Sequence, residues 1–100
     1  ESLAIAHLFG ERAGRIPITA NKSMIGHLLG ASSAVEAVAL VESLRHGIVP
    51  PTINLERPDT ECTLDYVPNE ARAADLRIGL SNSFGFGGHN AVIALRKFEG

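Results

Sequence analysis

The chain has 100 residues, of which 45% are hydrophobic and 20% are charged, and its formal net charge is -2 at pH 7. This balance excludes an intrinsically disordered chain, and the sequence has no basic stripe of the kind that binds nucleic acid. The single cysteine, Cys62, excludes a disulfide framework and fits a reducing compartment, with the cytosol as the default. The length fits one globular domain at most, with a modest core of its own.

Neither a signal peptide nor a membrane span is expected. The first five residues lack the basic start of a signal peptide. The stretch 78–95 has no Asp, Glu, Lys or Arg, but serines, asparagines, a histidine and glycines interrupt it too often for a membrane helix.

The first half of the chain predicts two helices and a short strand. Residues 3–8 predict a short helix that ends at Gly10. The β-branched run 16–19 predicts a short buried strand, at a strand start or a sheet edge because it contains a proline. From residue 27 to 46, apolar residues recur every three or four positions, which predicts a long helix followed by a capping glycine. This helix is apolar on nearly all sides, which is typical of a helix covered on more than one side.

The second half predicts a surface connection and then a strand pair. Residues 56–75 are charged and rich in turn formers, with a short strand expected around residues 64–67. Residues 77–83 and 90–97 predict two strands that flank a glycine-rich loop. The expected class is therefore an α/β layer with an antiparallel strand pair at its end.

The first candidate site is the segment 21–30, which joins a predicted strand to the long helix, where ligand sites of α/β proteins tend to lie. His27 is expected in the first helical turn, where the helix dipole disfavours imidazolium and favours a neutral ring. A neutral ring can donate a hydrogen bond to a developing enolate oxygen, and Lys22 can add positive charge nearby. The alternative is a capping or structural histidine beside a solvated lysine.

Glu36 is the second candidate, because it lies in an apolar helix and needs a cation or several donors if it is buried. Lys22 or a metal ion would supply the cation, and the alternative is that Glu36 lies on a solvent-exposed face of the helix.

The third candidate is the loop 81–88, whose glycines let the backbone approach a ligand closely and let the loop move. Its two phenylalanines either line or gate an apolar channel or fill the core of a tight hairpin.

Other catalytic interpretations are weaker. Cys62 lies among acidic residues, a poor setting for a nucleophilic thiolate, so a structural or idle role is favoured. No Cys and His residues have the spacing of zinc ligands. The segment 85–90 lacks the third glycine of a dinucleotide fingerprint and precedes a predicted strand instead of a helix.

Three motifs together closely resemble the C-terminal part of the β-ketoacyl-[acyl-carrier-protein] synthases, which are condensing enzymes with the thiolase fold. The motifs are KSMIGHLLGA at 22–31, PPTINL at 50–55 and SNSFGFGG at 81–88, and the resemblance covers essentially the whole chain. The GHLL form is similar to the type II elongating synthases and differs from modular polyketide ketosynthases. The resemblance implies an α/β fold, the C-terminal portion of a thiolase-like fold, in which helices layer on a mixed sheet with a terminal antiparallel strand pair.

The resemblance also implies the reaction, a decarboxylating Claisen condensation of an acyl thioester with malonyl carrier protein in fatty-acid elongation. The implied partners are acyl carrier protein and a second copy of the full-length protein in a homodimer, with no cofactor. The implied location is the cytoplasm, or the stroma or matrix of an organelle.

Site residues follow from the same motifs. His27 matches one of two histidines that assist the decarboxylation and stabilise the enolate oxygen, and Lys22 supports the electrostatics around it. Glu36 matches the acidic residue linked to that lysine. Phe86 matches the gatekeeper phenylalanine. The substrate gate and pocket residues implied here are Phe84, Phe86 and Gly87. No metal is required, although Glu36, Ser81 and Asn82 match positions implicated in a structural cation in some members.

Two departures from the family pattern matter. His89 stands where many members have threonine. The family's nucleophilic cysteine and first histidine lie upstream of the matching segment, so residues 1–100 are expected to be a partial C-terminal domain without condensing activity of its own.

Two alternative functions are a non-catalytic acyl- or partner-binding module of the same fold, and a decarboxylase or thiolase relative. The Lys22 and His27 pair with the double-phenylalanine loop favours the synthase over a thiolase.

Overall fold

The computed structural model describes residues 1–60 and 62–98. The chain divides into two compact units, each built from two separate stretches. Unit 1 comprises Glu1–Ile25 and Val49–Arg72, and unit 2 comprises Gly26–Ile48 and, of the described residues, 73–98. Strands β1 (Ile48–Val49) and β2 (Arg72–Ala73) form a two-stranded sheet, and the chain passes from one unit to the other within each of them.

Unit 1 starts with three short helices. Helix α1 (Ser2–Phe9) ends at Gly10, whose φ of 58° is a conformation that glycine adopts without steric cost. The 3-10 helix η1 (Gly10–Arg15) follows, and helix α2 (Lys22–Ile25) comes after an irregular stretch. The helix predicted at residues 3–8 is therefore confirmed.

The two strands predicted for unit 1 are wrong. Residues 16–19 are held to the neighbouring segment by a bond from the Ile18 N–H to the Asp65 carbonyl, 2.8 Å between N and O, and Pro17 beside it has no N–H to extend a ladder. Residues 64–67 form no strand either. There Val67 has a φ of 48°, a left-handed conformation that is an outlier for a β-branched residue and interrupts an extended chain.

A charged pair fixes the turn around Val67. The Arg72 guanidinium donates to both carboxylate oxygens of Asp65, with Nη2 3.0 Å from Oδ1, and the Val67 N–H donates to the same Oδ1 at 3.1 Å. Chiefly through the Arg72 hydrogen bond, the pKa of the Asp65 carboxyl lies below its ordinary value of 3.8. This turn places the Val67 side chain in the small core of unit 1, where it is fully buried. The buried apolar residues of this core are Ala13, Val49 and Val67.

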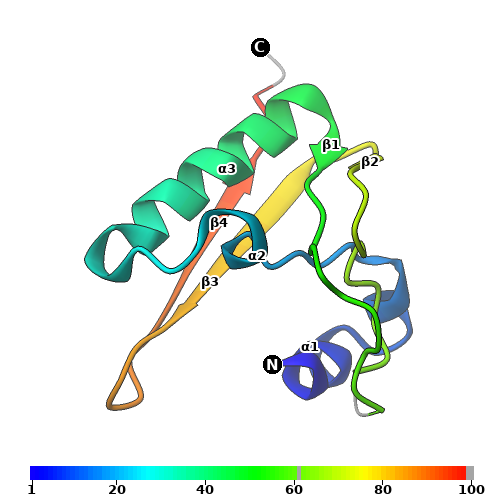
Figure 1. Ribbon diagram of the computed structural model, residues 1–100. Coiled ribbons are helices and arrows are strands. Elements are labelled where there is room, and N and C mark those ends of the chain that lie inside the picture. Colours follow the sequence, from blue (N-terminus) through cyan, green and yellow to red (C-terminus); the bar gives the residue numbers. More distant parts are fainter. Residues whose placement is uncertain (61, 99–100) are drawn as a thin grey trace. The chain divides into compact units, whose positions relative to one another are not determined.

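Unit 2 is one long helix on a β-hairpin. Helix α3 (Ser32–His46) packs against strands β3 (Ile78–Phe84) and β4 (Asn90–Arg96), and Figure 1 shows it running along the strand pair. The strands are antiparallel, in a register that pairs Ile78 with Arg96 and Phe84 with Asn90. The predicted pair of terminal strands is confirmed.

The helix approaches the hairpin closely at Gly79. A Cβ atom built on Gly79 would overlap the Leu40 Cδ1 and lie 3.2 Å from its Cγ, so only glycine lets α3 and β3 meet at this distance. Other apolar side chains of α3 and the hairpin stay exposed within the described chain. They include Val35, Val38, Val41, Ile78, Leu80, Val92 and Ile93. Among the described residues, no helix is long and apolar enough to span a membrane.

Candidate active site

His27 lies in the loop between α2 and the 3-10 helix η2 (Leu29–Ala31), not in the first turn of a long helix. The prediction that the helix starts at residue 27 is wrong, because α3 begins at Ser32. Positive φ values of 76° at Gly26 and 51° at Leu29 interrupt a right-handed helix here. The dipole of α3 acts mainly within its first turn, so the expected effect of a helix dipole on His27 does not apply.

The backbone around His27 determines which of its ring nitrogens accepts a hydrogen bond. The Leu29 N–H donates to His27 Nδ1, with 2.9 Å between the two nitrogens. A backbone N–H can only donate, so Nδ1 is an acceptor without a proton and the proton of the neutral imidazole is on Nε2. The loop therefore presents His27 as an exposed Nε2–H donor, the form required to stabilise an oxyanion.

Ser32 is a residue that the sequence analysis did not identify. Its Oγ accepts the Leu28 N–H at 2.8 Å and lies 3.1 Å from His27 Nδ1. It is 6% exposed and is the buried polar residue of the described chain. A serine five residues after the histidine, at the start of the helical pattern, is the sequence signal that could have identified it.

Lys22 and Glu36 lie in different units. Lys22 is the exposed first residue of α2 in unit 1, and Glu36 is a half-buried residue of α3 in unit 2. The link between them that the family motif implies remains a prediction.

The three residues of the expected cation site all belong to unit 2. Glu36 is on α3, and Ser81 and Asn82 are half-buried on β3, the strand on which α3 packs. Ser33 Oγ donates to Ser83 Oγ at 3.0 Å and joins the same two elements. One carboxylate, one hydroxyl and one amide form an oxygen donor set that suits a hard cation. Among the described residues no group of three or more His, Cys, Asp and Glu could hold a metal ion, so a cation here would depend on the neutral oxygens.

The glycine-rich segment is a hairpin loop between β3 and β4. The Gly85 N–H donates to the His89 carbonyl at 2.6 Å, and Gly87 has a φ of 80°. Phe84 is exposed and Phe86 is fully exposed. Neither phenylalanine is buried within the described chain, and both interpretations of the loop, a lining or gate of an apolar channel and a hairpin whose phenylalanines fill core, remain predictions.

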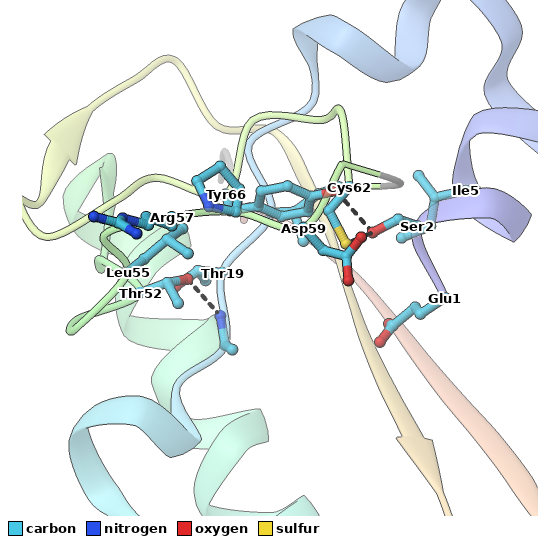
Figure 2. Close-up of a pocket in the computed structure, with 13 residues that line it drawn as sticks. Glu1, Ser2, Ile5, Thr19, Thr52, Leu55, Arg57, Asp59, Cys62 and Tyr66 are labelled. Atoms are coloured by element: carbon cyan, nitrogen blue, oxygen red, sulfur yellow. Dashed lines mark hydrogen bonds between the residues drawn. The ribbon is translucent and has the colours of Figure 1, made fainter.

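A pocket of about 300 Å³ opens in unit 1, and no sequence motif predicted it. Figure 2 shows Ser2, Cys62 and Tyr66 grouped at one side of it. The Ser2 and Tyr66 hydroxyl oxygens are 2.8 Å apart, and Ser2 Oγ donates to Cys62 Sγ at 3.9 Å. Cys62 thus belongs to a small polar cluster of unit 1.

Solved structures share this fold closely. One is described as a type II PKS acyl-carrier protein in complex with its ketosynthase bound to the hexaketide, with a TM-score of 0.94 and 43% identity over 98% of this chain and 24% of the other. Another is a β-ketoacyl synthase from Burkholderia phymatum STM815, with a TM-score of 0.89 and 43% identity over 99% of this chain and 24% of the other. The fold is that of the thiolase-like ketosynthases.

The family follows from the sequence comparisons. The model of the β-ketoacyl synthase C-terminal domain matches residues 1–56. The 3-oxoacyl-[acyl-carrier-protein] synthase 2 of Synechocystis sp. is 52% identical over 99 residues, and that of Staphylococcus aureus (strain COL) is 50% identical over 99 residues. Each alignment covers 99% of this chain and 24% of the relative, so the chain spans about a quarter of the relatives' length. The chain belongs to the β-ketoacyl synthase family.

Proposed function

We propose that this chain is the C-terminal part of a 3-oxoacyl-[acyl-carrier-protein] synthase that elongates fatty acids by decarboxylative condensation. The observation that carries the proposal is His27, held as a neutral Nε2–H donor within the motif shared with the condensing enzymes. The relatives that are 50–52% identical to this chain are 3-oxoacyl-[acyl-carrier-protein] synthases 2, which supports fatty-acid elongation.

His27 has a defined part in this chemistry. In the malonyl thioester the bond to the terminal carboxylate breaks, carbon dioxide leaves, and the electron pair forms an enolate on the thioester oxygen. The His27 Nε2–H donates a hydrogen bond to that oxygen, and Lys22 supplies positive charge to the same region. The enolate carbon then attacks the acyl thioester on a cysteine and expels the thiolate. Loss of one such oxyanion donor costs about 10²–10³-fold in kcat.

We place the family's nucleophilic cysteine and its first histidine outside these 100 residues, and His27 is the second histidine of the pair. Cys62 is the single cysteine and does not match the nucleophile motif. The exposed apolar side chains of α3 and of the β3–β4 hairpin fit a partial domain that further chain covers. Residues 1–100 are therefore the C-terminal portion of a thiolase-like domain and contribute part of an active site.

The remaining residues are assigned by motif and position. Phe86, Phe84 and Gly87 form the substrate gate. Phe84 is exposed at the end of β3, and Phe86 is exposed on the following loop beside Gly87, which has a positive φ. Glu36 supports Lys22, and together with Ser81 and Asn82 it would hold a structural cation. The partners are acyl carrier protein, bearing acyl or malonyl thioesters, and a second copy of the full-length protein, in the cytoplasm.

The full-length protein that contains this segment tests the proposal. It is incubated with acyl carrier proteins loaded with chains of several lengths and with malonyl carrier protein, and 3-oxoacyl products are measured by mass spectrometry. We expect turnover in the wild type and its loss in His27→Ala, with activity kept in the control His7→Ala, which changes an exposed histidine of α1. Binding of acyl carrier protein without turnover would contradict the proposal and support a non-catalytic module.

A further inference from the structure

Ser32 is a buried hydroxyl at the start of α3. It is 6% exposed, and buried hydroxyl groups nearly always have hydrogen-bond partners. One partner is the Leu28 N–H, which donates to Ser32 Oγ at 2.8 Å. The serine accepts this bond, so its own proton is still available for an acceptor.

The acceptor that the structure provides is His27 Nδ1, 3.1 Å from Ser32 Oγ. Because Nδ1 already accepts the Leu29 N–H, it carries no proton, and Ser32 must be the donor in this contact. Two donors therefore share the single lone pair of the same ring nitrogen in a three-centre bond, one from the backbone of the loop and one from the first residue of the long helix.

This arrangement ties the imidazole to α3. A rotation of the ring that moves Nδ1 away breaks the bonds to both Leu29 and Ser32, so the direction of Nε2–H is fixed from the opposite side of the ring. The Leu28 bond in turn holds the loop backbone against the same serine. Groups that hydrogen-bond the far nitrogen of a functional histidine commonly fix its tautomer and orientation.

We propose that Ser32 is a positioning residue that orients His27 for the condensation. The proposal rests on the proposed function, in which His27 Nε2–H stabilises the enolate. Loss of the hydroxyl leaves His27 Nδ1 with the Leu29 bond and deprives the Leu28 N–H of its acceptor. Loss of such a supporting group at metal-bound histidines typically costs 10–100-fold, so we expect about a 10-fold fall in the condensation rate.

The test uses the full-length protein and separates the two halves of the reaction. Ser32→Ala should lower kcat for malonyl decarboxylation and condensation about 10-fold, with little change in KM and no change in the rate of acyl transfer to the nucleophile. Ser32→Cys, close in size but a weak donor, should lower the same step and guards against a folding failure of the alanine variant. Ser43→Ala is the matched control. Its hydroxyl donates to the Ala39 carbonyl in the same helix, and its loss should leave both halves unchanged.

A double-mutant cycle decides whether Ser32 acts through His27. In a His27→Ala background, Ser32→Ala should have no further effect on decarboxylation. Equal loss in both half-reactions, or an additive effect in the double variant, would show a general structural role and overturn the proposal. Unchanged decarboxylation in Ser32→Ala, with His27→Ala inactive, would also overturn it while leaving the proposed function intact. An inactive wild type would instead contradict the proposed function.

Discussion

Gly79 allows the close contact between α3 and β3, and replacing it with alanine tests the packing of unit 2. The new methyl group would overlap Leu40 Cδ1 and lie 3.2 Å from Cγ and 3.5 Å from Cδ2. Overpacking of this kind costs about 1–3 kcal/mol, and the lower backbone entropy of alanine recovers about 0.4–1 kcal/mol. We therefore expect Gly79→Ala to lower the free energy of unfolding of the full-length protein by about 1–2 kcal/mol.

Denaturant unfolding, followed by circular dichroism, measures this effect. Gly14→Ala is the matched control, because a Cβ atom there meets no atom within 4 Å and its φ is not positive. Leu40→Ala removes the clashing side chain, so the double variant should be less destabilised than the sum of the two single variants. Wild-type stability in Gly79→Ala, or strict additivity with Leu40→Ala, would refute the packing argument.

Three further predictions concern the pH dependence, the gate and the isolated chain. The pKa of Asp65 is lowered in the folded state, so its stabilising contribution is complete above the ordinary value of 3.8 and is lost as the pH falls through the folded pKa. Arg72→Met should therefore shift acid unfolding of the full-length protein to higher pH; an unchanged acid transition would contradict this. Phe86→Ala should lower the rate of condensation by the full-length protein, because the motif places Phe86 at the substrate gate. Wild-type condensation in that variant would remove Phe86 from the gate. The isolated 100-residue chain should form no 3-oxoacyl product by mass spectrometry, and turnover would place the nucleophile within it.

The sequence predicted the elements that local patterns determine. The apolar periodicity of residues 32–46 and the alternation around a glycine-rich turn specify α3 and the β3–β4 hairpin without help from distant residues. The β-branched run 16–19 looked like a strand but lacks a neighbouring ladder, because the facing segment turns at Asp65 and Val67. Strand formation depends on a partner whose conformation local propensity does not reveal.

The sequence identified residues of the candidate site, but it did not indicate the backbone conformation that arranges them. The motif identified His27 and Lys22, but nothing in the residue type of Leu29 indicates its φ of 51°. The positive φ values at Gly26 and Leu29 interrupt the helix, which begins only at Ser32, and in this turn the Leu29 N–H donates to His27 Nδ1. A backbone hydrogen bond to Nδ1, and not the helix dipole expected from the sequence, defines which nitrogen of His27 accepts, and the Ser32 contact depends on the same local turn.

The rate of malonyl carrier protein decarboxylation by the full-length protein tests the central claim most directly. It is compared between the wild type and His27→Ala, with the thermal unfolding of both proteins recorded as a check on folding. The account predicts a fall of about 10²–10³-fold in His27→Ala while acyl transfer to the nucleophile continues. Decarboxylation at the wild-type rate in a folded His27→Ala protein would contradict the assignment of His27 as the enolate-stabilising donor.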